Sequence, residues 1–292
     1  MLGGKRRSAL IAAAVALVLA VAGGAALAKD VSGTNGNDTL HGTAANDTMS
    51  GGRGDDRLFG DGGDDTIDGG PDSDTADGGS GNDTVAGASC KVGEVGRQCD
   101  NPGHEHLTGG TGNDTLLANT CVITFCAYEH YIAFSSTYDG GPGNDNLHGA
   151  DGPDTMHGGP GADVLRPLGG ADRAFGGPGD DVLITSGGDD LLSGDDGNDY
   201  MKGRAGNDRM LGGRGNDKLW GVDGADVMIG GRGRDRLKGA EGPDKMYGGP
   251  ANDRFYARDG EADLVDCGPG TADVAFIDAL DTVKDCEQVH RG

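Results

Sequence analysis

Carboxylates at a fixed spacing are the residues of this 292-residue sequence with the clearest chemical potential. An aspartate recurs in twenty nine-residue segments, six between Gly33 and Ala86, one between Gly109 and Leu117, and thirteen between Gly140 and Tyr256. Each segment follows the pattern G-G-x-G-(N/D)-D-x-U-x, where U is apolar; position 4 is Gly in seventeen copies and position 6 is Asp in all twenty. The position-6 aspartates are Asp38, Asp47, Asp56, Asp65, Asp74, Asp83, Asp114, Asp145, Asp154, Asp163, Asp172, Asp181, Asp190, Asp199, Asp208, Asp217, Asp226, Asp235, Asp244 and Asp253.

Identical carboxylates stacked on one another repel, so the pattern calls for a cation. Calcium takes six to eight oxygen ligands and accepts both carboxylates and the backbone carbonyls that a glycine-rich turn exposes. Magnesium demands nearly octahedral geometry and keeps its waters, so it suits the pattern less well. The alternative is that the aspartates only shape turns, but Asn or Ser would then serve as well. We expect Ca²⁺ as the cofactor and the twenty aspartates as its ligands.

Two kinds of local structure must position these side chains. Positions 1–6 combine Gly with Asn and Asp, which is typical of turns. Positions 7–9 can form one short strand, with position 8 pointing to a core. A single nonapeptide cannot bury its apolar residue, so two repeats form a coil and coils stack on their neighbours. Gly-Gly pairs starting at residues 140, 158, 176, 212, 230 and 248 alternate with degenerate copies, which indicates two unequal sides of such a roll.

The repeat resembles the hemolysin-type, or repeats-in-toxin (RTX), calcium-binding nonapeptide, and the resemblance covers 180 residues. It implies an all-β fold, a parallel β-roll or β-solenoid that binds calcium between stacked turns. The family typically exports its members through a C-terminal signal, whereas this chain has an N-terminal one. Related rolls accompany pore-forming toxins, proteases, lipases and polysaccharide-modifying enzymes.

Composition and the first residues bear on location and partners. The chain has 24 basic and 48 acidic residues, a net charge of −24, which argues against nucleic acid or anionic lipid as partners. Low aromatic content and 60 glycines suggest that the calcium-free chain is unfolded and that calcium folds it. Residues 1–28 have the basic, apolar and small-residue regions of a signal peptide. We expect a secreted or cell-surface protein, exported by the Sec or the twin-arginine route; a retained N-terminal anchor is the alternative.

Residues 87–139 interrupt the register with two 22-residue insertions around the repeat at 109–117. The insertions carry four cysteines and a cluster of aromatic residues, and insertions into repeats often form a binding face. They either contact a protein or glycan partner or simply cover the side of the roll. The triplet His104-Glu105-His106, with His130 further along, raises a zinc site as a minor alternative to exposed loop histidines.

Residues 257–292 leave the register and are expected to cap the last coil. Six cysteines in an exported chain suggest three disulfides, with fifteen possible connectivities. We favour local pairs, and the main alternative joins the two insertions crosswise. The local pairs are Cys90 with Cys99, Cys121 with Cys126, and Cys267 with Cys286.

Outside the repeats, little chain remains for an enzyme domain. The roll at 33–86, the roll at 140–256, the insertions and the cap account for nearly everything after residue 28. The sequence lacks a G-x-S-x-G elbow, an H-E-x-x-H motif and a Walker A loop. We therefore predict an exported, non-catalytic calcium-binding protein with a structural or interaction role. The alternatives are a component of a cytolysin-like toxin and a module that assists a secreted hydrolase.

Overall fold

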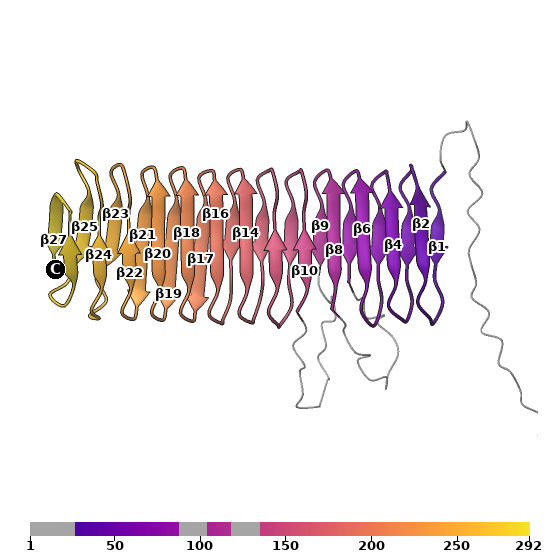
Figure 1. Cartoon of the computed structure of the whole chain (residues 1–292), viewed down its shortest axis with the longest axis horizontal. Helices are drawn as coiled ribbons and strands as arrows, with labels where there is room; N and C mark the ends of the chain where they lie inside the picture. The colour runs from indigo at the N-terminus through magenta and orange to yellow at the C-terminus, as the bar shows by residue number, and fades with distance from the viewer. Residues whose placement is uncertain (1–26, 88–103, 118–134) are drawn as a thin grey trace, which may run out of the picture.

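Each nonapeptide folds as a turn followed by a short strand, and successive strands alternate between two parallel sheets. The computed structural model describes residues 27–87, 104–117 and 135–292. In this part of the chain all regular secondary structure is β, and the coils stack into a long solenoid with β1 at one end and β27 at the other (Figure 1). The predicted all-β parallel β-roll is confirmed.

The odd sheet, which we name for its odd-numbered strands, has fourteen strands in chain order. They are β1 (Asp30–Ser32), β3 (Thr48–Ser50), β5 (Thr66–Asp68), β7 (Thr84–Ala86), β9 (Thr115–Leu117), β11 (Asn146–His148), β13 (Val164–Arg166), β15 (Val182–Ile184), β17 (Tyr200–Ala205), β19 (Lys218–Asp223), β21 (Arg236–Glu241), β23 (Arg254–Ala257), β25 (Val274–Ile277) and β27 (Gln288–Arg291).

The even sheet has thirteen strands and lies opposite. They are β2 (Thr39–Thr43), β4 (Arg57–Asp61), β6 (Thr75–Ser80), β8 (His106–Thr111), β10 (Thr137–Asp139), β12 (Thr155–His157), β14 (Arg173–Pro178), β16 (Leu191–Asp196), β18 (Arg209–Arg214), β20 (Val227–Arg232), β22 (Lys245–Tyr247), β24 (Leu264–Asp266) and β26 (Thr282–Lys284).

Strand pairing places each residue beside its equivalent two repeats away. Lys218 of β19 pairs with Arg236 of β21, for example, which pairs with Arg254 of β23. One coil is therefore eighteen residues, two nonapeptides, as the alternating Gly-Gly pairs predicted. In the long block, every Gly-Gly pair at positions 1 and 2 of a repeat precedes an odd-numbered strand.

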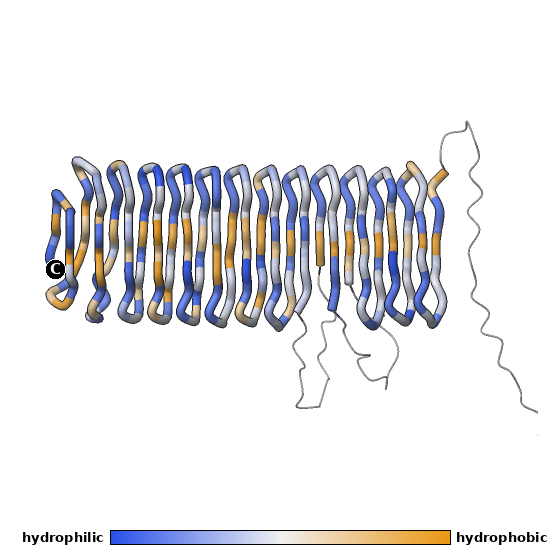
Figure 2. Tube along the Cα trace, viewed as in Figure 1, coloured by the Kyte–Doolittle hydropathy of each residue, from blue (hydrophilic) through white to orange (hydrophobic). Residues whose placement is uncertain are grey.

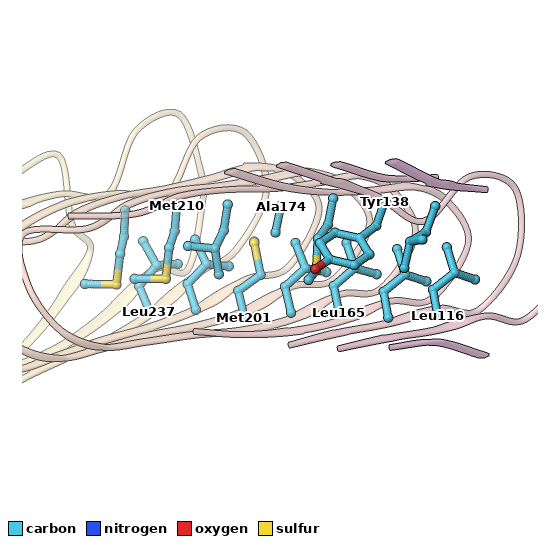
Figure 3. Packing of buried hydrophobic residues seen from close by; sticks show 14 of the residues in the cluster. Leu116, Tyr138, Leu165, Ala174, Met201, Met210 and Leu237 are labelled. Carbon is cyan, nitrogen blue, oxygen red and sulfur yellow. The ribbon is translucent and has the colours of Figure 1, made fainter. Parts of the chain in front are cut away.

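The core is a double row of the position-8 residues, one row from each sheet. All twenty are at most 5% exposed, and Leu107, Tyr138, Val265 and Ala275 extend the rows. Figure 3 shows the row that contains Tyr138, Ala174 and Met210 facing the row that contains Leu116, Leu165, Met201 and Leu237. Hydrophobic residues recur midway along the strands (Figure 2). Each core residue contacts only the adjacent residues of its own row and those of the facing row. The apolar contacts are therefore alike from coil to coil, and the turns must hold the coils in register.

The C-terminal segment continues the roll before it ends. Residues 257–292 supply β24 to β27, which pair in register with the preceding coils. Cys267 and Cys286 form the predicted disulfide, with their Cα atoms 5.1 Å apart. The predicted pairs Cys90–Cys99 and Cys121–Cys126, and nearly all of the predicted signal peptide, lie outside the described residues. Within the described ranges, no helix is long and apolar enough to cross a membrane.

Candidate metal sites

The turns bring the position-6 aspartates into two ladders, one along each edge where strands begin. The odd ladder holds the aspartates that precede odd strands, and the even ladder those that precede even strands. The odd ladder is Asp47, Asp65, Asp83, Asp114, Asp145, Asp163, Asp181, Asp199, Asp217, Asp235 and Asp253. The even ladder is Asp38, Asp56, Asp74, Asp154, Asp172, Asp190, Asp208, Asp226 and Asp244. Nineteen of the twenty are at most 3% exposed, and Asp38 in the first coil is half-buried.

One carboxylate oxygen of each rung ties two coils together. The backbone N–H of Asp199 donates to Asp217 Oδ1 at 2.9 Å, and that of Asp217 donates to Asp235 Oδ1 at 2.9 Å. The same bond links Asp190 to Asp208 and Asp226 to Asp244 in the even ladder. Each ladder aspartate after Asp38 therefore binds the preceding coil through Oδ1, which fixes the direction of its other oxygen.

The second oxygen, Oδ2, is buried without a hydrogen-bond donor in seventeen of the twenty aspartates. The exceptions are Asp38, Asp47 and Asp154, whose Oδ2 atoms accept the N–H of Thr34, Thr43 and Ala150. A buried polar atom without a partner is costly, and native folds seldom tolerate more than a few. A regular series of seventeen indicates that a group of positive charge completes the site.

Glycine at position 1 leaves room for that group. A Cβ placed on Gly158 would lie 2.5 Å from Asp163 Oδ2 and 2.6 Å from the carbonyl oxygen of Gly176 in the next coil. Gly109 has the same two neighbours at 2.6 Å each, from Asp114 and Gly140. A carboxylate from one coil and a carbonyl from the next thus converge beside each such glycine. Oxygen donors of these two kinds are the ligands that calcium prefers, so the donor set fits Ca²⁺.

Position 2 has a positive φ in fifteen of the twenty copies, which explains the second glycine of the repeat; the exceptions are Thr34, Thr43, Ala150, Leu168 and Ser186. Gly213 and Gly231 have φ of 108° and 105°. The degenerate copies place Arg204, Val222 and Ala240 in the same conformation, with φ of 77°, 104° and 78°. Such a conformation is an outlier for a β-branched residue, so Val222 strains its turn.

Burial without a positive partner raises the pKa of these carboxyls. Their ordinary value is 3.8, and the pKa rises to about 6 for Asp217, about 7 for Asp199 and about 8 for Asp244. Desolvation is the main cause; the N–H of the preceding coil opposes it and nearby carboxylates reinforce it. Cations and protons therefore compete for the same oxygens.

Thr185 occupies one of the glycine positions beside the even ladder. It stands at position 1, where the preceding even copy has Pro167 and the next has Gly203, and its side chain is fully buried. Its hydroxyl donates to the carbonyl oxygen of Gly203 in the next coil, at 2.5 Å. That carbonyl corresponds to the one that elsewhere faces a cation site, so the threonine hydroxyl takes up a ligand position.

Glu105 and Ser136 are rungs of the even ladder that the nonapeptide pattern did not reveal. The N–H of Asp74 donates to Glu105 Oε2 at 3.1 Å, the N–H of Glu105 donates to Ser136 Oγ at 3.3 Å, and the N–H of Ser136 donates to Asp154 Oδ1 at 2.9 Å. Among the described residues, His104, Glu105 and His106 do not come together as a group of metal ligands; His130, the other residue of the zinc alternative, lies outside them. Leu107 and Tyr138, each two residues after its rung, give the only sequence signal, an apolar position 8.

The ladders also continue past the last repeat. Asp263 and Asp273 are buried, accept the N–H groups of Asp244 and Asp253, and have unpartnered Oδ2 atoms. Asp259 adds a third carboxylate to Asp244 and Asp263, with one oxygen of each within 4.8 Å of the others. The D-x-U spacing of Asp263-Leu264-Val265 and Asp273-Val274-Ala275 was available in the sequence as a signal.

The sequence matches one family, described as the RTX calcium-binding nonapeptide repeat (4 copies). The matches cover residues 32–67, 59–89, 101–120, 139–174, 167–201, 175–210, 202–237 and 229–261, which together exceed half of the chain. No curated protein matches the chain in sequence.

Proposed function

Because the chain belongs to the RTX calcium-binding nonapeptide repeat family, whose repeats bind Ca²⁺ in a structural role, we propose that it is an exported, non-catalytic protein whose roll folds when calcium binds. The observation that carries the proposal is the series of seventeen buried Oδ2 atoms without donors. The twenty aspartates of the two ladders are the proposed ligands, and Asp263 and Asp273 extend the set.

Bound calcium would supply the positive charge and the coordination positions that these oxygens lack. The protein contributes the order of the site. Oδ1 of each aspartate holds the preceding coil, glycine at position 1 keeps side chains out, and a carbonyl of the following coil lies beside the free oxygen. Each site therefore draws on two coils, so filling it joins them, and the folding of stacked units becomes cooperative.

The secondary structure of the described residues supports a structural or interaction role. Residues 27–87, 104–117 and 135–292 are almost entirely strands and the turns between them. The segment 87–139, which contains both insertions, is the proposed contact for a protein or glycan partner. Export is supported by the composition of residues 1–28 and by the family, whose members are typically exported. Extracellular calcium modules bind at roughly 10⁻⁴–10⁻³ M, so the roll would fold only after export.

A calcium titration of the purified protein, starting from a chelator and followed by circular dichroism, tests the proposal. We expect a cooperative gain of β-structure with calcium, no comparable gain with magnesium, and several ions bound per chain by calorimetry. A polypeptide that is equally compact and protease-resistant in chelator would show that the ladders close without calcium. The matched variants are Asp217→Asn in the ladder and Asp223→Asn on the exposed end of β19; only the first should raise the calcium midpoint.

A further inference from the structure

The outer face of the odd sheet becomes basic and aromatic from β17 to β25. Positions 7 and 9 of each strand point outward, because position 8 points to the core. In these five strands the ten outward positions hold five cations, four aromatic residues and one valine, and no carboxylate. This basic-aromatic face is Tyr200, Lys202, Lys218, Trp220, Arg236, Lys238, Arg254, Tyr256, Val274 and Phe276.

The cations of the face form a row that runs along the axis of the roll. Lys218, Arg236 and Arg254 lie on three consecutive strands in direct register, so adjacent charges are separated by about 4.8 Å, the spacing of paired strands. All three are exposed. Like charges directly opposite each other on paired strands are destabilising. Among the described residues, none of the five cations forms an ion pair with a carboxylate.

The same positions elsewhere on the roll show that this is not a general property of the repeat. The outward positions of β3 to β11 in the odd sheet contain no Lys or Arg. In the even sheet, Arg173, Arg209 and Lys245 lie on alternate strands, with Leu191 and Val227 between them. If the cations only balanced the acidic turns, the separated arrangement would be favoured, because it avoids placing like charges opposite each other on paired strands. The consecutive row instead indicates an anionic ligand with repeated charges.

A groove continues the row onto the adjoining turns. It is lined by Asn216, Lys218, Arg234, Arg236, Asn252 and Arg254. The odd-ladder residues Asp217, Asp235 and Asp253 also line it, and each of these three aspartates is at most 1% exposed. Those aspartates are the proposed calcium ligands, so calcium would cancel the negative charge directly behind the row. The face then attracts anions although the chain carries a net charge of −24.

We propose that this face binds a linear acidic polysaccharide, one carboxylate- or sulfate-bearing sugar chain laid along the roll axis. A sugar unit extends a glycan by a length comparable to the strand spacing, so successive acidic units can meet successive cations. An extended polypeptide advances about 6.6 Å between side chains on one side, which does not match the spacing of the row. Asn216 and Asn252 accept backbone N–H groups of the next coil through Oδ1, so the N–H groups of their side chains are what they can offer to sugar oxygens.

The aromatic residues of the face argue against nucleic acid. Binding of single strands depends on free ring faces on which bases stack. Lys202 Nζ and Lys238 Nζ lie 4.3 and 4.5 Å from the centre of the Trp220 ring, from the two strands that flank it. Tyr256 and Phe276 stack on each other with centroids 5.3 Å apart, so their facing surfaces are also covered. Trp220 therefore acts as a spacer that holds Lys202 and Lys238 in place.

The test uses the calcium-loaded full chain and three variants. Lys218→Gln/Arg236→Gln/Arg254→Gln removes the row, and Arg173→Gln/Arg209→Gln/Lys245→Gln removes the same charge from the same repeat position on the other sheet. The third, Asp217→Asn, reports on calcium binding. Short oligogalacturonate is the probe, with neutral dextran, oligothymidylate and polyglutamate as comparators, and calorimetry is run at several salt concentrations. Circular dichroism of each sample shows whether the roll is still folded. Loss of the roll in the presence of calcium would count against the calcium proposal, whereas loss of glycan binding by a folded roll is an effect on the face alone.

We expect oligogalacturonate to bind the wild-type roll and dextran not to bind. Losing three contacts should reduce the slope of log K against log salt by about 2–3, whereas the even-sheet variant should keep the wild-type slope. Equal binding by the wild type and the row variant, or an equal loss in the even-sheet variant, would overturn the proposal. Tighter binding of oligothymidylate or polyglutamate than of oligogalacturonate would overturn the assignment to a glycan.

Discussion

Acid should stabilise the roll when calcium is removed, the reverse of its effect on the calcium-loaded protein. The ladder carboxyls have pKa values raised by burial, to about 6 for Asp217 and about 7 for Asp199. In the unfolded chain they return to the ordinary 3.8. Between about pH 4 and pH 7 the calcium-free roll therefore holds more protons than the unfolded chain. Its free energy of unfolding must fall as the pH rises through this window.

The magnitude is large compared with the stability of a domain. Raising the pKa of Asp217 from 3.8 to about 6 corresponds to about 3 kcal/mol once the group is ionised. Two such carboxylates enter with every coil, whereas whole domains are stable by about 5–15 kcal/mol. A few ionised coils are enough to unfold the roll. At neutral pH the ladder must bind a cation, hold protons or come apart.

The assay is a pair of denaturant titrations by circular dichroism in chelator, at about pH 5 and about pH 8, with calcium-loaded samples at the same two values. We expect more β-structure and a higher midpoint at pH 5 without calcium. In the loaded samples the calcium concentration at half-folding should fall as the pH rises, because the ligands must be ionised. A calcium-free roll that is as stable at pH 8 as at pH 5 would refute the reasoning.

General repulsion in an acidic chain would also weaken with acid, so a variant must separate the two effects. Asp217→Asn removes one ladder carboxyl and should reduce the pH dependence by up to about 1.4 kcal/mol per pH unit. Glu241→Gln removes the same charge from an exposed site at the end of β21 and should leave the pH dependence nearly unchanged. Equal effects of the two substitutions would assign the pH dependence to net charge and not to buried ladder groups.

Three further substitutions have expected outcomes. Thr185→Gly should free the Gly203 carbonyl and add one calcium ion per chain by calorimetry, whereas Thr84→Gly, in a strand, should add none; an unchanged count in Thr185→Gly would contradict the role of that threonine. Val222→Gly should raise the free energy of unfolding of the calcium-loaded roll by about 1–3 kcal/mol, since it relieves a β-branched residue at φ 104°. Val227→Gly, in β20, should lower it, and a loss in both would mean that Val222 is not strained. Replacing Cys267 and Cys286 with serine should lower stability by about 3 kcal/mol in denaturant titrations and loosen β24 to β27 first, and wild-type protease resistance of this segment would contradict that expectation.

The nine-residue period predicted the fold because it contains all the local chemistry. Glycines mark the turn, position 8 marks the core, and position 6 marks the ladder, so the strands and buried rows followed directly. Glu105 and Ser136 escaped because no Gly-Gly pair precedes them in the sequence and because a glutamate or a serine replaces the aspartate. The last coils escaped because the pairing distance changes from eighteen residues to nineteen, twenty and fourteen. In both regions the ladder continues because the strands still pair in register, although the repeat pattern or its spacing changes. The sequence does not show this pairing.

The basic-aromatic face lay beyond sequence reasoning for a different reason. Residues nine apart in the chain lie on opposite sheets, and residues eighteen apart are neighbours. In linear order Arg209, Lys218, Arg236, Lys245 and Arg254 form one basic trend at position 7, in which cations of the two sheets cannot be told apart. The coil separates them: Lys218, Arg236 and Arg254 become a continuous row on one sheet, while Arg209 and Lys245 are isolated on the other by Val227. Net charge averages over both sheets and both ladders, so a strongly acidic total is compatible with one locally basic face, and the total charge gives no reason to exclude an anionic partner there.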